Sequence, residues 1–421
     1  MKPFKRFFIL LMLFDFAGRL YGQTITELLK QAYEKYQKKD FNGAIADYDS
    51  AIALDPRSFD AYKGRGTAKF DLQLFEDALK DYDKAIALNP KSFEARGSRA
   101  TIRCAMGRFE SAVTDLDTAI LLKPASDSAY VGRGTAKFNL QRYTEAISDF
   151  DKALSLRPNQ YGAYMGKGAA EYEMGNYTAA ISDLDKAIAL DPKTWEAHFQ
   201  RGVAEAQLEK YAAAVNDYDQ AIVLDPKSDT TYTKRGEAKN ALKQYAGAIS
   251  DFDNALLITP RSFGAYVGRA MAKNAMEQYA DAVRDLDSAL SIQRSAEVYL
   301  YRGKTKISLK QYADAVMDIA LYLVYIPNNA DAYFASAYAK SRVDNLGDPL
   351  PDFNKAIELD KNNPDYYYYR AVAYYAQALH TNSKEDFQHS LNDIDMSEKL
   401  GKKLSADVQK LRTTIVAALK Q

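Results

Sequence analysis

The sequence predicts an all-α fold, a right-handed α-solenoid of helical hairpins that ends in a C-terminal capping helix. The first observation is a repeated phrase, because "GRGTAKF" occurs at residues 64–70 and again at 132–138. A looser version, "GSRATIR", lies midway between them at 97–103, so the true period is 34 residues. A period in this range is typical of arrays in which each unit packs only on its neighbours.

Regularly spaced prolines mark the end of each unit. Proline cannot continue a helix, and it moves the residue before it out of the helical region, so it predicts a turn into the next unit. The prolines that follow the 34-residue period are Pro56, Pro90, Pro124, Pro158, Pro192, Pro226 and Pro260.

Two helices are expected inside each unit. In the second unit, residues 60–72 and 76–88 both place apolar residues at helical spacing and are rich in helix-forming residues. The small residues Gly66, Ala78 and Ala85 let two helix backbones approach closely, and Tyr82 fills the space between them. Each unit is therefore a helical hairpin that needs neighbours to bury its apolar face.

These landmarks resemble the tetratricopeptide (TPR) repeat family. In the second unit the residues that carry the resemblance are Tyr62, Gly66, Ala78, Tyr82, Ala85 and Pro90. Eight regular units follow the pattern, at 25–58, 59–92, 93–126, 127–160, 161–194, 195–228, 229–262 and 263–295. Three divergent units follow at 296–329, 330–363 and 364–402, so about eleven tandem repeats cover most of the chain.

The predicted domain organisation has four parts: residues 1–22, 23–295, 296–402 and 403–421. Pro349 stands where the tenth unit should have alanine, so its second helix is expected to begin late. The last part is predicted to be a capping helix, because it has one apolar stripe at helical spacing. This stripe consists of Leu404, Val408, Leu411, Ile415 and Leu419.

The N-terminus has the pattern of a secretory signal peptide. Lys2, Lys5 and Arg6 precede the apolar run "FFILLMLF" at 7–14, and small residues follow up to Gly22. The run is shorter than the roughly 20 residues that a membrane-spanning helix needs. The mature chain is therefore expected to begin at Gln23 and to be periplasmic or extracellular, without a transmembrane span after cleavage. An uncleaved membrane tether is the alternative.

Composition excludes several classes of function. Lys plus Arg number 56 and Asp plus Glu also number 56, whereas a general nucleic-acid binder needs a basic excess. One cysteine, Cys104, and three histidines leave little material for disulfides, metal sites or His-based catalysis. No catalytic motif stands out from the repeat, so the sequence predicts a protein that is not an enzyme and that has no cofactor.

Paired aspartates recur in the second helices, as in Asp81 and Asp83. Residues two apart on a helix point about 200° away from one another, so such a pair cannot hold one metal ion. The first aspartate of each pair is instead expected to face a basic residue of the first helix, as Asp81 faces Arg65. A ladder of such pairs also accounts for the balanced charge.

The resemblance implies that first helices line a concave groove that binds a protein or an extended peptide. At the fifth and twelfth positions of the repeat this groove is expected to be apolar and aromatic, which suits a partly hydrophobic segment. A structural protein that self-associates through its divergent C-terminal repeats is the alternative function, and position-twelve side chains that pack in the core are the alternative for the site. The candidate partner-binding residues are Lys63, Phe70, Phe138, Met165, Tyr172 and Phe199.

Overall fold

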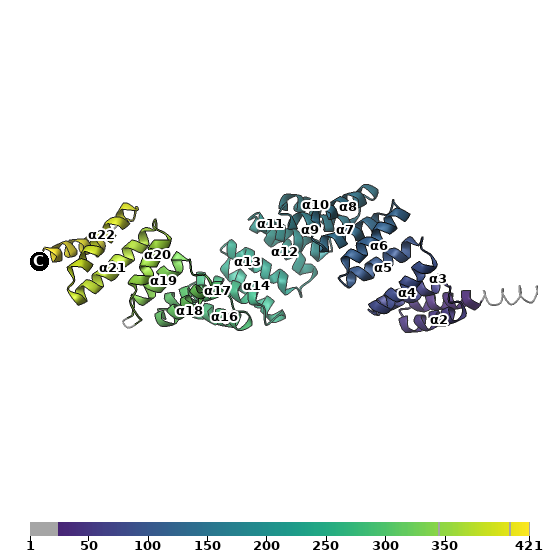
Figure 1. The fold of residues 1–421 in the computed structure, drawn as a ribbon, viewed down its shortest axis with the longest axis horizontal. Coiled ribbons are helices and arrows are strands. Elements are labelled where there is room, and N and C mark those ends of the chain that lie inside the picture. Colours follow the sequence, from purple (N-terminus) through teal and green to yellow (C-terminus); the bar gives the residue numbers. More distant parts are fainter. Residues whose placement is uncertain (1–23, 344–345, 404–405, 421) are drawn as a thin grey trace, which may run out of the picture. The chain divides into compact units, whose positions relative to one another are not determined.

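A computed structural model describes residues 24–343, 346–403 and 406–420, and no strand occurs among them. Consecutive helices pack as hairpins in chain order (Figure 1), which confirms the predicted α-solenoid of tandem repeats. The chain divides into two compact units, Met1–Glu209 and Lys210–Gln421. The expected signal peptide at 1–22 and Leu404 of the expected stripe lie outside the described residues.

The first unit consists of hairpins whose first helices have 13 residues and whose second helices have 14. It begins with helical residues 24–37. The helices that follow are α2 (Phe41–Leu54), α3 (Phe59–Asp71), α4 (Phe75–Leu88), α5 (Phe93–Ala105), α6 (Phe109–Leu122), α7 (Asp127–Asn139), α8 (Tyr143–Leu156), α9 (Tyr161–Glu173), α10 (Tyr177–Leu190) and α11 (Trp195–Gln207).

The second unit continues the pattern and then departs from it. Its regular helices are α12 (Tyr211–Leu224), α13 (Asp229–Ala241), α14 (Tyr245–Ile258), α15 (Phe263–Ala275), α16 (Tyr279–Ile292), α17 (Ala296–Ser308) and α18 (Tyr312–Tyr325). The divergent end contains α19 (Ala330–Lys340), α20 (Leu350–Leu359), α21 (Pro364–Thr381), α22 (Lys384–Lys399) and α23 (Ala406–Leu419).

Local sequence sets where the helices begin and end. A serine side chain at the N-cap of six first helices accepts a hydrogen bond from the backbone N–H three residues further on, which satisfies one free donor of the first turn. Gly107 and Gly175 follow two of the first helices with φ of 71° and 78°, a left-handed conformation that glycine adopts without strain. The serine caps thus mark where these first helices begin, and the glycine turns lead the chain into the second helices α6 and α10.

Glycines let aromatic rings lock neighbouring hairpins together. Phe150 of α8 is fully buried between Gly134 of α7 and Gly166 of α9. A Cβ atom at Gly134 would lie 2.8 Å from the Phe150 ring, and one at Gly166 would lie 2.4 Å from it. The ring therefore occupies space that only glycine leaves open on both first helices, which confirms the expected close approach of the helix backbones.

A ladder of ion pairs runs through both units. Arg133 binds the buried Asp149 of its own repeat in a bidentate manner, with N–O distances of 2.9 and 2.5 Å. Its third contact, of 2.6 Å, is to Asp117 of the preceding repeat, which is half exposed. The expected pairing of Asp81 with Arg65 is confirmed, and the buried partner distinguishes it from a surface salt bridge. The arginines that make both contacts include Arg65, Arg99, Arg133, Arg235, Arg269 and Arg302.

The divergent repeats differ where the sequence departs from the pattern. α20 has only 10 residues and begins after Pro349, which confirms the expected late start. α21 has 18 residues and so takes up part of the insertion in the eleventh unit. Val408 and Ile415 of α23 are buried in one apolar cluster with Ile394 of α22, as a capping helix requires. In the part of the chain that the structure describes, no helix is both long and apolar enough to cross a membrane.

Candidate partner-binding site

The six predicted partner-binding residues lie on four first helices of the first unit, and all six are half-buried. They are Lys63 and Phe70 on α3, Phe138 on α7, Met165 and Tyr172 on α9, and Phe199 on α11. The structure brings three of them together and separates the rest.

Phe138, Tyr172 and Phe199 meet at one pocket of about 230 Å³, here called the aromatic pocket. Gly168 and Ala169 of α9 also line it. Because Gly168 has no side chain and Ala169 has only a methyl group, the space between the three rings stays open. The remaining lining residues are Glu173, Leu184, Gln200 and Val203. Consecutive first helices thus supply aromatic walls to a single apolar site.

The rings of the aromatic pocket are held in place by neighbouring rings. Phe138 lies 5.5 Å from Tyr143 between ring centroids, and Tyr172 lies 5.4 Å from Tyr177. Both arrangements are tilted, a favourable geometry for aromatic pairs. Phe138 also packs against the cluster of the buried Phe150. These side chains therefore belong both to the hairpin core and to the pocket wall, so the pocket is formed before a ligand arrives.

The polar groups of the aromatic pocket are few. Glu173 is exposed at the pocket, and no lining residue is basic. Gln200 has a buried side-chain oxygen without a hydrogen-bond partner among the described residues. This lining suits an aliphatic or aromatic side chain and does not suit an acidic one.

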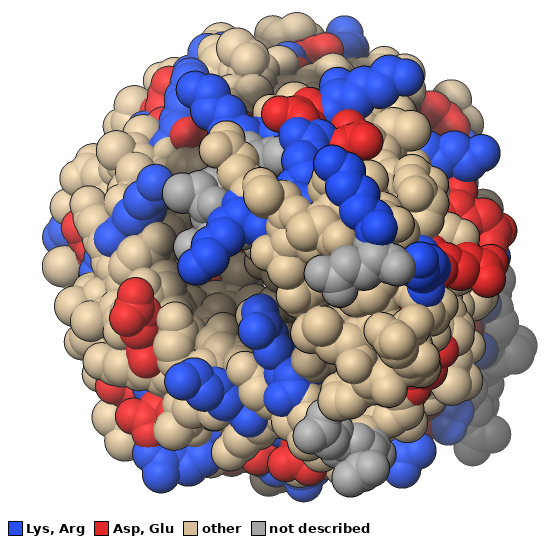
Figure 2. Space-filling model, turned by 90° about the vertical axis from the view of Figure 1, so that its left-hand side faces the viewer, with Lys and Arg blue, Asp and Glu red and all other residues tan. Residues whose placement is uncertain are grey.

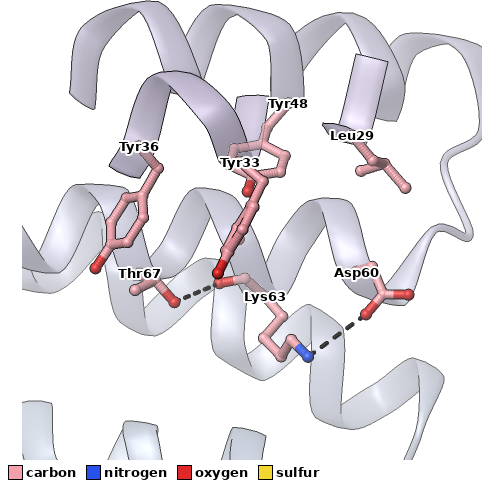
Figure 3. A pocket seen from close by; sticks show the side chains of 8 residues that line it. Leu29, Tyr33, Tyr36, Tyr48, Asp60, Lys63 and Thr67 are labelled. Atoms are coloured by element: carbon pink, nitrogen blue, oxygen red, sulfur yellow. Dashed lines mark hydrogen bonds and ion pairs between the residues drawn. The ribbon is translucent and has the colours of Figure 1, made fainter. Parts of the chain in front are cut away.

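Lys63 belongs to a different pocket of about 290 Å³ near the start of the chain. Tyr33, Tyr36 and Tyr48 line it together with Leu29, Asp60, Gly64 and Thr67. Figure 3 shows that the Lys63 side chain points towards Asp60, and the Nζ–Oδ1 distance is 3.5 Å. The Thr67 hydroxyl donates a hydrogen bond of 3.0 Å to the Lys63 carbonyl. The Lys63 ammonium thus already has a partner on its own helix.

Phe70 and Met165 are placed outside both pockets. The Phe70 ring packs on Phe75 of its own hairpin, with centroids 5.8 Å apart, and on the cluster around Leu79. Phe70 is therefore mainly a core residue, in line with the alternative interpretation for position twelve. Met165 is half-buried on α9 and lines neither pocket.

A larger pocket of about 570 Å³ in the second unit was not among the predicted sites. Phe334 and Tyr338 of α19 and Tyr369 of α21 form its aromatic part. Phe334 and Tyr338 occupy the fifth and ninth positions of their repeat, and this was the signal that could have located the pocket from sequence. Lys402, which follows α22, also lines this pocket and forms an ion pair with Asp365. The pocket is therefore lined by residues that are distant from one another in the sequence.

The outer face of α18 carries an exposed apolar stripe. Met317, Leu321, Val324 and Tyr325 are 60, 44, 76 and 60% exposed, and their spacing of four, three and one residues places them on one helix face. Other second helices have polar residues at the position of Leu321, namely Lys84, Thr118, Lys152, Lys186, Gln220, Asn254 and Ser288. Large exposed apolar patches mark interaction surfaces, so this "α18 stripe" is a second candidate surface.

Charge is mixed on the part of the surface that carries the C-terminal end. Figure 2 shows Lys and Arg side chains interspersed with Asp and Glu and with uncharged residues on this face. A surface that follows a phosphate backbone is instead uniformly basic. The viewed face therefore agrees with the balanced charge of the chain.

Repeated hairpins joined by a ladder of ion pairs define the class of helical-repeat proteins. Tetratricopeptide repeat models match residues 59–92, 98–161 and 165–229, and a TPR repeat model matches 32–73. The chain therefore contains tandem tetratricopeptide repeats. No curated protein matches it.

The solved structures to which the chain is similar include two that are described as tetratricopeptide repeat proteins. A tetratricopeptide repeat protein from Parabacteroides merdae ATCC 43184 is 24% identical, covering 60% of this chain and 100% of that chain, with a TM-score of 0.49. YrrB, described as a TPR protein with an unusual peptide-binding site, is 23% identical over 44% of this chain and 95% of its own, with a TM-score of 0.38. Yeast Tom70 is 16% identical over 94% and 96%, with a TM-score of 0.39.

Proposed function

We propose that the protein is a non-enzymatic adaptor, exported to the cell envelope or beyond, that binds another protein through the aromatic pocket. The observation that carries this proposal is the convergence of Phe138, Tyr172 and Phe199 from three successive first helices on one apolar site. The N-terminal charged and apolar residues support export.

The partner is an extended segment that inserts an aliphatic or aromatic side chain between the three rings. The pocket volume of about 230 Å³ accommodates a side chain rather than a whole helix. Because Glu173 is at the pocket and no lining residue is basic, the residues beside the inserted side chain are neutral or basic.

Site-specific photo-crosslinking in the native host tests both the pocket and the location. The probe benzoyl-phenylalanine replaces Glu173, which is exposed and lines the pocket. We expect it to form a cross-linked product with a partner, and we expect that product in the envelope or extracellular fraction. Ala169→Arg should reduce the product several-fold, because a charged side chain then projects from the pocket wall.

The matched control places the same probe at Ala105, which occupies the corresponding exposed position two repeats earlier. Equal cross-linking from Ala105 and Glu173 would contradict the assignment of the pocket. A product confined to the cytosol would contradict export. The melting temperature of Ala169→Arg must match that of the wild type, so that loss of binding is not loss of fold.

Self-association is the second candidate function, and the α18 stripe favours it. α18 contains no Lys or Arg, so its apolar face lacks the basic flank that binding to an anionic membrane requires. Two copies that pack stripe to stripe bury the same residues on both sides, as a two-fold interface does.

We expect light scattering to show a molar mass that rises towards twice the monomer mass as the protein concentration increases. Leu321→Glu should abolish this rise, because it places two carboxylates in the interface. Ser288→Glu, at the same position of α16, is the control and should leave the rise unchanged. A wild-type protein that stays monomeric at all concentrations would exclude this function.

A further inference from the structure

The α9–α10 hairpin departs from the ion-pair ladder. In six other hairpins, the buried aspartate of the second helix also receives a Lys or Arg that lies one helical turn after the ladder arginine. These residues are Lys69, Arg103, Lys137, Lys239, Lys273 and Lys306, with N–O distances of 2.6–2.9 Å. In α9 the corresponding residue is Glu171, and Lys167 replaces the ladder arginine. Glu205 takes the same position in the next repeat.

The substitution places two carboxylates together in the α9–α10 hairpin. Glu171 is 8% exposed, and its Oε2 atom has no hydrogen-bond partner among the described residues. Asp183 of α10 is 4% exposed. Its cationic contacts are single-point ones, to Lys167 at 3.4 Å and to Lys186 at 3.0 Å. The α9–α10 hairpin therefore has one more buried acid and one fewer buried base than the α7–α8 hairpin, in which Arg133 and Lys137 both bind Asp149.

The charges around Glu171 do not compensate for its burial. The pKa of Glu171 is raised to about 7, first by burial and next by the charge of the nearby Asp183, while Lys167 lowers it by less. The cations on the flanking first helices have other partners, because Lys137 binds Asp149 at 2.8 Å and Arg201 binds Asp185 at 2.6 Å.

We propose that the α9–α10 hairpin is a proton-controlled element, closed when Glu171 is protonated and loosened when Glu171 is ionised. The protonated carboxyl group can donate a hydrogen bond to Asp183, whereas two ionised carboxylates repel one another in a site with little water. Gly168, Ala169 and Tyr172 of the aromatic pocket lie on the same hairpin. If the proposed function holds, the partner binds the aromatic pocket more tightly when Glu171 is protonated than when it is ionised.

The sign of the effect follows from proton binding. Glu171 binds its proton more tightly in the closed hairpin than in the open chain, where its pKa has the ordinary value near 4.5. The stabilisation is therefore complete at pH values below 4.5. It decreases as the pH rises towards 7 and is absent above that pH.

Hydrogen exchange of the free full-length protein at pH 5.5 and pH 8 tests the proposal, with rates corrected for intrinsic exchange. We expect amides of α9 and α10 to be less protected at pH 8, by on the order of tenfold. The α7–α8 hairpin is the control within the same molecule. There Lys137 occupies the position that corresponds to Glu171 and binds Asp149, so the protection of this hairpin should not change with pH.

Two variants separate Glu171 from other titrating groups. Glu171→Gln should abolish most of the difference between the two pH values, since the amide has the same shape and does not ionise. Glu171→Lys should raise protection of α9 and α10 at both pH values, because it restores the basic residue that binds the buried aspartate in six other repeats. Equal protection of the wild-type hairpin at both pH values, or an unchanged difference in Glu171→Gln, would overturn the proposal. The experiment needs no partner, so its outcome is independent of the cross-linking result.

Discussion

Phe150→Ala is expected to lower the free energy of unfolding by about 3–5 kcal/mol, the usual cost of removing a buried aromatic side chain. The Phe150 ring is fully buried, and the glycines on both neighbouring first helices leave no side chain to fill the space. Urea denaturation followed by circular dichroism measures the change.

Phe150→Leu is the matched control, because Leu116, Leu184 and Leu286 occupy the same position in other repeats. It should cost less than about 1.5 kcal/mol, as a substitution between large apolar residues usually does. If the alanine variant is no less stable than the leucine variant, Phe150 does not join the hairpins in the way described. If the free energy of unfolding of the alanine variant depends less steeply on the urea concentration than that of the wild type, the array no longer unfolds cooperatively.

Asp149→Ala is expected to cost about 3–5 kcal/mol, because it leaves Arg133 and Lys137 without their buried partner. Arg133 donates two hydrogen bonds to Asp149, so the substitution removes a bidentate pair as well as a charge. The same urea titration at neutral pH measures the loss.

Asp117→Ala provides a control on the same arginine. Asp117 is about half exposed, and its pairing with Arg133 is therefore expected to contribute only about 0–1 kcal/mol. If Asp149→Ala and Asp117→Ala lower the free energy of unfolding equally, burial of the aspartate does not determine how much each ion pair contributes to stability.

Much of the fold could be predicted because each hairpin is specified by residues that are close together in the sequence. Proline turns, small residues and apolar spacing specify each hairpin, and the pairing of Asp81 with Arg65 followed from the helix faces on which they lie. The burial of that pair could not be predicted in the same way, since exposure depends on how the neighbouring repeat covers it.

The candidate site was predictable only in part, for the same reason. Phe70 and Phe138 occupy equivalent positions, yet Phe138 lines a pocket because Gly168 and Ala169 of the next repeat are small. The sequence alone does not distinguish Glu171 from other glutamates, because a glutamate on a charged helix is usually solvated. Its significance appears only once its side chain is known to be buried.

The ladder has a consequence for how such a chain can change in length. Arg65, Arg99, Arg133, Arg235 and Arg269 each lie 16 residues from the partner in the preceding repeat and 16 from the partner in their own. Arg302 lies 15 from Asp287, because the loop before its repeat is one residue shorter. Insertion or removal of one complete 34-residue repeat therefore leaves these arginines with both partners, whereas removal of one helix of a hairpin takes away one of the two partners. Gene segments that encode whole repeats can be duplicated without loss of these contacts. The identical phrases at 64–70 and 132–138 lie two complete periods apart, and Arg65 and Arg133 within them have the same spacing to both partners.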